Sequence, residues 1–205
     1  MSSRCCDSGC STPAVSPGFR KALWVALAIN LVMFIVEIVS GLRSGSVSLL
    51  ADAIDFAGDA ANYAITLTVL SMGAIWRSRA ALVKGVSMLA FGVFVLARAG
   101  WAIHAGVVPD PLTMGVIGAL ALVANVVVAL MLYAFREGDS NMRSVWLCSR
   151  NDALGNIAVM IAAAGVFGTG SGWPDFIVAL IMAGLALTAG YSVVRQARQE
   201  LRAAG

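Results

Sequence analysis

Two pairs of metal-binding side chains recur at a four-residue spacing within apolar stretches of the chain. Asp55 and Asp59 form the first pair, and Cys148 and Asp152 form the second. Side chains four residues apart project from one face of a helix, about 5–6 Å from each other. Three carboxylates and one thiol would give the four donors that zinc binds in a tetrahedron, whereas magnesium and calcium prefer oxygen alone. The spacing therefore predicts a zinc site between two helices, and the thiol would also suit cadmium. Alternatively, Cys148 could be a small apolar filler, and a single aspartate could pair with Arg98 or Arg150.

The aspartate pair further predicts that metal binding is linked to protons. Two carboxylates at that distance repel each other by about 3 kcal/mol at an effective dielectric constant near 20. An empty pair should therefore retain a proton near neutral pH, because burial also disfavours the charged form. A divalent cation would relieve the repulsion and displace that proton.

Composition indicates which elements must position these residues. The 205 residues are 60% hydrophobic and 12% charged, against about 45–50% apolar and about 25% charged in soluble domains. A helix needs about 20 apolar residues to span a bilayer. The sequence therefore predicts an all-α integral membrane protein with six transmembrane helices, at 21–42, 46–75, 81–103, 112–135, 145–167 and 176–194. We divide it into a cytoplasmic tail (1–18), a six-helix domain (19–197) and a short basic tail (198–205).

The basic residues predict the orientation of these helices. Eleven lysines and arginines belong to the side of the membrane that carries the two termini. They lie in the two tails, at the start of the first span, and in or beside the second and fourth connections; Lys84, just beyond the predicted break at 76–79, is counted with them. The other connections carry only Arg43. Because cytoplasmic loops are enriched in basic residues, both termini should be cytoplasmic in a bacterial-type inner membrane. The charges do not cluster in the way that nucleic-acid binding requires.

Other polar residues inside the spans are candidates for accessory roles, because such groups are costly in a membrane. Glu37 could pair with Arg98 or with the backbone, or could belong to a proton path. Asp52 could hydrate the exit or cap its helix. Asn151 and Asn156 are better explained as hydrogen bonders between packed helices.

The N-terminal tail carries three further cysteines, Cys5, Cys6 and Cys10. Their spacing matches no specific zinc finger. They could capture a soft metal, or the tail could be an inert terminus. The tail has no apolar core, and so it does not read as a signal peptide.

Two segments resemble the signatures of the cation diffusion facilitators. The first runs from Glu37 through Gly41 and Gly45 to the run Leu49–Ala53, and it places Asp55 and Asp59 on the family's metal-ligand positions. The second has Cys148 and Asp152 where the family has a histidine and an aspartate. The resemblance covers about residues 19–197.

This resemblance implies a six-helix transporter, usually a homodimer, that exports zinc or related divalent ions in exchange for protons by alternating access. It implies no cofactor besides the transported ion. Cys148 in place of the usual histidine favours softer ions such as cadmium. We expect a form without the family's cytoplasmic C-terminal domain, so that membrane helices alone would hold a dimer. The small residues of the third span would allow the close contact that such a dimer needs.

Three other functions would use some of the same residues. An intramembrane aspartyl protease would need a Gly-x-Gly-Asp segment, whereas the chain has Ala57-Gly58-Asp59, so we expect no enzyme. A transporter of organic cations would leave the cysteines unexplained. A membrane metal sensor or scaffold without turnover needs the same ligands as a transporter, and only proton-dependent flux would distinguish the two.

Overall fold

The computed structural model describes residues 17–69, 74–134 and 140–203, and these residues are almost entirely helical. The expected all-α fold is confirmed. The helices are α1 (Pro17–Ser44), α2 (Val47–Val69), α3 (Ala74–Ala105), α4 (Pro111–Tyr133), α5 (Ser140–Thr169) and α6 (Trp173–Ala203).

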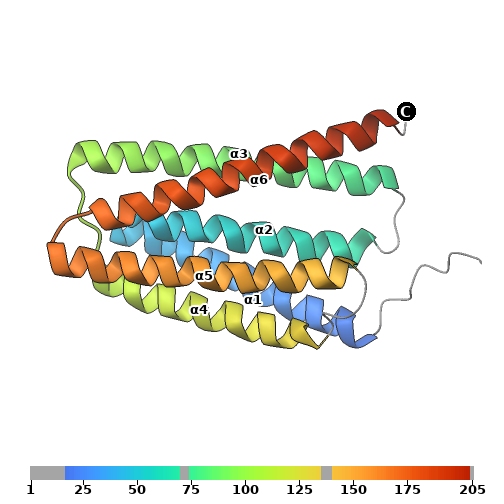
Figure 1. Cartoon of the computed structure of the whole chain (residues 1–205), viewed down its shortest axis with the longest axis horizontal. Helices are drawn as coiled ribbons and strands as arrows, with labels where there is room; N and C mark the ends of the chain where they lie inside the picture. Colours follow the sequence, from blue (N-terminus) through green and yellow to red (C-terminus); the bar gives the residue numbers. More distant parts are fainter. Residues whose placement is uncertain (1–16, 70–73, 135–139, 204–205) are drawn as a thin grey trace, which may run out of the picture.

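The six helices run along one long axis and alternate in direction (Figure 1). The first and last described residues, Pro17 and Ala203, lie at the same end of the bundle, which we call the terminal end. The opposite end carries the short connections 45–46, 106–110 and 170–172, and we call it the short-loop end. Consecutive helices are therefore antiparallel, as the short breaks in the sequence predicted.

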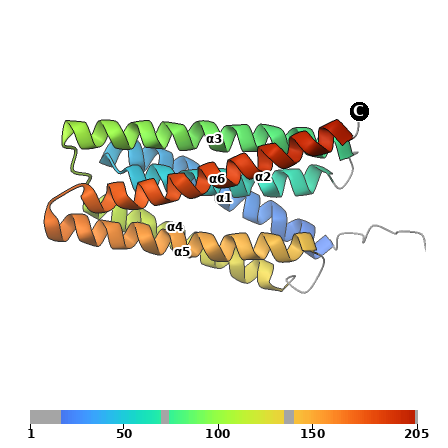
Figure 2. The same cartoon turned by 45° about the horizontal axis from the view of Figure 1, so that its top comes forward.

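Helix α2 lies at the centre of the bundle, since it contacts each of the other five helices. The most extensive packing joins α3 to α6, α4 to α5 and α1 to α2, whereas the described residues of α3 contact only α2 and α6. Figure 2 shows α3 and α6 together on one side and α4 with α5 on the other. The molecule thus consists of a four-helix group (α1, α2, α4, α5) and an α3–α6 pair.

Glycines allow α3 and α6 to approach closely. A Cβ atom on Gly85 would lie 2.7 Å from Val194 Cγ2, and one on Gly92 would lie 2.8 Å from Leu187 Cδ2. A Cβ on Gly190 would come within 3.2 Å of the Gly85 carbonyl oxygen. The small residues of the third span, which we expected at a dimer contact, therefore pack against α6 of the same chain.

Five of the six helices are long and apolar enough to cross a membrane, and α2 is the exception. Helix α2 carries Asp52, Asp55 and Asp59, which lower its hydropathy. Its central position keeps these carboxyl groups away from lipid. Large apolar side chains such as Phe167 and Leu112, which are 81% and 74% exposed, cover the outer surface instead. This distribution is that of a multi-pass membrane protein.

One predicted break is wrong. Residues 76–79 were expected in a connection, but they lie in α3, which begins at Ala74. No proline or glycine interrupts this stretch, and basic side chains are compatible with a helix. Ser78 Oγ donates a hydrogen bond to Glu200 Oε2 at 2.6 Å, so the first turns of α3 pack against the last turns of α6. Helix α6 itself continues to Ala203, through the start of the segment placed in a basic tail.

At the short-loop end, Asp175 of α6 caps the N-terminus of α2. Its carboxylate accepts hydrogen bonds from Ser46 Oγ (2.7 Å), the Val47 amide (2.7 Å) and the Ser48 amide (3.0 Å). Asp175 is fully buried. A negative charge at this position satisfies amides that have no partner within the helix and interacts favourably with the helix dipole. The cap fixes the start of the helix that carries the three aspartates.

Candidate metal site

The aspartates of the two predicted pairs meet between α2 and α5. Asp55 and Asp59 lie one turn apart on α2, and the carboxyl groups of Asp59 and Asp152 are within hydrogen-bonding reach of each other. Asp55 and Asp152 both line a cavity of about 770 Å³, which residues of α3 and α6 close from the other side. The structure therefore brings these three carboxyl groups near one another, beside an open cavity between α2, α5 and α6.

Two neighbours on α2 hold Asp59 in place. The Tyr63 hydroxyl donates a 2.8 Å hydrogen bond to Asp59 Oδ2, and the side chain of Asn62 also hydrogen-bonds to Asp59. Both follow from helix periodicity, since residues three and four apart share a face. Tyr63 and Asp59 are 1% and 6% exposed, so the carboxyl group is oriented by a buried partner.

The described side chains do not yet form a complete coordination sphere. Among them, no three His, Cys, Asp or Glu groups converge tightly enough to hold a metal ion. Cys148 lies one turn before Asp152 in the sequence of α5, but its side chain is outside the described part. The arrangement supplies three carboxylates near one another, and a bound ion would require them to close in.

A second carboxyl pair lies closer to the short-loop end. Glu37 of α1 and Asp52 of α2 are within hydrogen-bonding reach of each other, and they are 0% and 1% exposed. Within the described contacts, none of their four oxygens accepts a hydrogen bond from another group. Two carboxylates this close would repel each other, and a single proton between them would relieve that repulsion. Of the two roles considered for Asp52, the helix cap is wrong, because Ser46 and Asp175 cap α2; hydration of the exit stays a prediction.

The structure does not confirm the contacts expected of the other accessory residues. The expected pairing of Glu37 with Arg98 is not among the described contacts; the Arg98 guanidinium lies over the Trp101 ring at 4.8 Å. Asn156 is fully buried, and its amide has no hydrogen-bond partner among the described residues. It therefore does not act there as the helix-packing hydrogen bonder that we expected. The side chain of Asn151 and the tail cysteines Cys5, Cys6 and Cys10 lie outside the described residues.

Sequence reasoning missed two side chains near Asp59. Tyr63 follows Asp59 by four residues, and this spacing could have identified it as a hydrogen-bond donor. Lys84 was counted with the cytoplasmic charges, but it lies well inside α3, and its Nζ donates a hydrogen bond to Asn62 Oδ1. Its position in an apolar helix was the available signal, because a charge there usually has a functional reason.

Comparison with known proteins agrees with this architecture. The model of the cation efflux transmembrane domain matches residues 23–202. The metal cation efflux system protein CzcD of Cupriavidus metallidurans is 24% identical, over 80% of this chain and 56% of the relative. The cadmium, cobalt and zinc/H(+)-K(+) antiporter of Bacillus subtilis is 23% identical, over 86% of this chain and 61% of the relative. The zinc transporter ZitB of Escherichia coli is 26% identical, over 88% and 62%.

The chain spans about three-fifths of the length of these curated relatives. The family match nevertheless covers nearly all of the described helices, including both segments that carry the aspartates. These findings confirm the resemblance noted in the sequence. The chain belongs to the cation efflux family, that of the cation diffusion facilitators, and is a multi-pass protein of the cell membrane.

Proposed function

We propose that this protein exports a divalent metal cation from the cytoplasm in exchange for protons, by alternating access. One observation carries the proposal: Asp55, Asp59 and Asp152 gather beside a cavity of about 770 Å³ within a bundle of membrane-spanning helices. Carboxylates at such a depth are costly and are usually retained for function. Membership in the cation efflux family supports the same activity.

Proton exchange follows from the chemistry of these carboxyl groups. Asp59 and Asp152 are within hydrogen-bonding reach of each other, and two carboxyls in contact cannot both be ionised at low cost. In the metal-free protein they therefore share a proton. A divalent ion neutralises both carboxylates and releases that proton, so that metal and proton occupy the site in turn.

Zinc is the proposed substrate, with cadmium as the second candidate. The names of the relatives include zinc, cadmium and cobalt. The thiol of Cys148, one turn from Asp152 in the sequence, would complete four donors and favours a soft ion. Asp52 and Glu37 belong to the proposal as carriers of a second proton.

The test is metal uptake into proteoliposomes that contain the purified protein, with and without an imposed pH gradient. Zinc, cadmium, manganese and cobalt would be compared for the wild type, Asp59→Asn and Asp110→Asn. Asp110 is an exposed carboxylate in the connection 106–110 and serves as the control. We expect gradient-driven zinc or cadmium flux that Asp59→Asn abolishes and Asp110→Asn retains.

Tight metal binding without flux would contradict transport and would favour a sensor or scaffold. Flux that Asp59→Asn leaves intact would show that the site lies elsewhere. The proposal also includes a homodimer held by membrane helices, which light scattering on the purified protein would test. Capture of metal by the tail cysteines would be tested by replacing all three with serine and measuring metal binding.

A further inference from the structure

Lys84 brings a positive charge from α3 to the metal-binding face of α2. The residue lies within the apolar part of α3, and its Nζ donates a hydrogen bond to Asn62 Oδ1. The Asn62 side chain in turn hydrogen-bonds to Asp59, with which the Lys84 ammonium interacts electrostatically. Lys84, Asn62 and Asp59 therefore form one polar network between the two helices.

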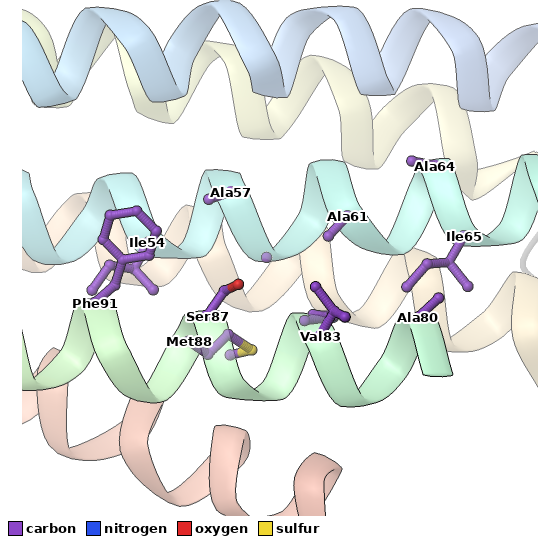
Figure 3. Close-up of a pocket in the computed structure, with 12 residues that line it drawn as sticks. Ile54, Ala57, Ala61, Ala64, Ile65, Ala80, Val83, Ser87, Met88 and Phe91 are labelled. Carbon is purple, nitrogen blue, oxygen red and sulfur yellow. The ribbon is translucent and has the colours of Figure 1, made fainter. Parts of the chain in front are cut away.

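This network crosses a loosely packed seam. A groove of about 460 Å³ separates α2 from α3 there, and Figure 3 shows the small side chains of Ala57, Ala61 and Ala64 along the α2 side. Lys84 is the only charged residue among those that line this groove. By contrast, α3 packs closely on α6 through Gly85 and Gly92. The seam thus divides the α3–α6 pair from the helix that carries Asp55 and Asp59.

The positive charge and the metal would compete for the same carboxylate. A divalent ion at Asp59 lies close to the ammonium, and like charges in a low-dielectric interior repel strongly. Exchanging the ammonium for a monovalent cation would gain little, because the charge on the site would stay the same. Exchanging it for a divalent cation adds one charge beside the neighbouring carboxylates of Asp55 and Asp152, so that only a divalent ion displaces Lys84 with a net gain.

We propose that Lys84 is the resident counter-cation of Asp59 in the metal-free protein, and that an entering divalent ion displaces it. This inference rests on the proposed efflux function and assigns Lys84 the role of a positioning and selectivity residue. Because Lys84 belongs to α3, its displacement removes a polar link across the α2–α3 seam. Metal binding thereby frees the α3–α6 pair to move relative to the four-helix group, and release of the metal restores the link.

The test compares Lys84→Met, Lys84→Gln and Lys84→Arg with the wild type. Lys21→Met is the matched control, because Lys21 is the other lysine of the chain and lies on the exposed side of α1. Zinc affinity is measured by competition with a fluorescent chelator, and kcat and KM by zinc flux into proteoliposomes. Thermal unfolding of each variant without metal reports whether it is folded.

Removal of the competing charge should tighten zinc binding by about tenfold, within the range of ordinary site–site coupling. Both neutral variants should lower KM and also lower kcat, because the ion leaves more slowly. Lys84→Arg should bind zinc as the wild type does, and Lys21→Met should change neither quantity. A merely structural role would lower the unfolding temperature without tightening the binding of zinc.

Unchanged or weaker zinc binding in both folded neutral variants would overturn the role of Lys84. If the wild type moves zinc while these variants show wild-type affinity, only this inference fails and the proposed function stands. If the wild type itself neither binds nor moves a divalent metal, the proposed function fails, and the role of Lys84 fails with it.

Discussion

Replacing Tyr63 by phenylalanine should weaken metal binding while keeping the fold. The substitution removes the hydroxyl that donates a 2.8 Å hydrogen bond to Asp59 Oδ2, and it keeps the ring that packs with Phe19, Leu23 and Leu67. A hydrogen bond to a charged group contributes about 1.5–3 kcal/mol, and loss of a partner that orients a metal ligand costs about 10–100-fold in affinity. We therefore expect zinc to bind at least about tenfold more weakly, which corresponds to roughly 1.4 kcal/mol.

The assay for this prediction is zinc competition with a fluorescent chelator on purified Tyr63→Phe, followed by zinc flux in proteoliposomes. Tyr191→Phe is the matched control, because Tyr191 lies on α6 and is 64% exposed. The control should retain wild-type affinity. If a folded Tyr63→Phe protein binds zinc within twofold of the wild type, Asp59 does not depend on this hydrogen bond, and its assignment as an oriented metal ligand is refuted.

Four further outcomes follow from other parts of the molecule. Asp175→Ala removes three hydrogen bonds at the start of α2 and should lower the free energy of unfolding by about 2–4 kcal/mol, as measured by thermal unfolding in detergent; an unchanged unfolding temperature would contradict the cap. Gly85→Ala places a Cβ atom 2.7 Å from Val194 Cγ2 and should destabilise by about 1–3 kcal/mol, whereas Gly100→Ala, with nothing within 4 Å, should not. The hydroxyl of Thr113 and backbone amides lower the pKa of Asp110. The ionised Asp110 therefore stabilises the fold at neutral pH, and this stabilisation is lost as the pH falls through the lowered pKa. The difference in unfolding temperature between the wild type and Asp110→Asn should vanish in acid. Cys148→His should retain transport and shift the preference from cadmium toward zinc in competitive uptake, and equal preference would mean that Cys148 is no ligand.

The fold could be predicted from the sequence because membrane helices obey a few strong constraints. Backbone groups in lipid must be satisfied within the helix, so long apolar stretches indicate helices and short connections indicate antiparallel neighbours. The spacing of Asp55 and Asp59 placed both on one face for the same reason. Asp152 could be assigned to the same site only through its own four-residue spacing from Cys148, and the structure places it within reach of Asp59.

Interactions between residues that lie far apart in the chain could not be predicted from the sequence in the same way. Asp175 lies well over one hundred residues from the amides that it caps, and nothing in its local sequence indicates that target. Lys84 was counted with the cytoplasmic charges because basic residues usually mark the cytoplasmic ends of spans. That rule applies to charges in water, whereas the side chain of Lys84 lines a groove between α2 and α3 and hydrogen-bonds to the half-buried Asn62. The pairing of Glu37 with Asp52 depends on how α1 and α2 are aligned, which composition does not determine.

The central position of α2 has a consequence for how the chain enters the membrane. An aspartate near the centre of a single inserting helix costs about 2.5–3.5 kcal/mol. Helix α2 carries Asp55 and Asp59 near its middle and Asp52 in its second turn, so this helix would partition poorly alone. Only residues 45 and 46 separate it from the strongly apolar α1. Helix α1 also supplies Glu37, whose carboxyl group lies within hydrogen-bonding reach of Asp52. We therefore expect α1 and α2 to enter the membrane together as a hairpin, in which the packing of α1 on α2 lowers the cost of burying the acidic residues.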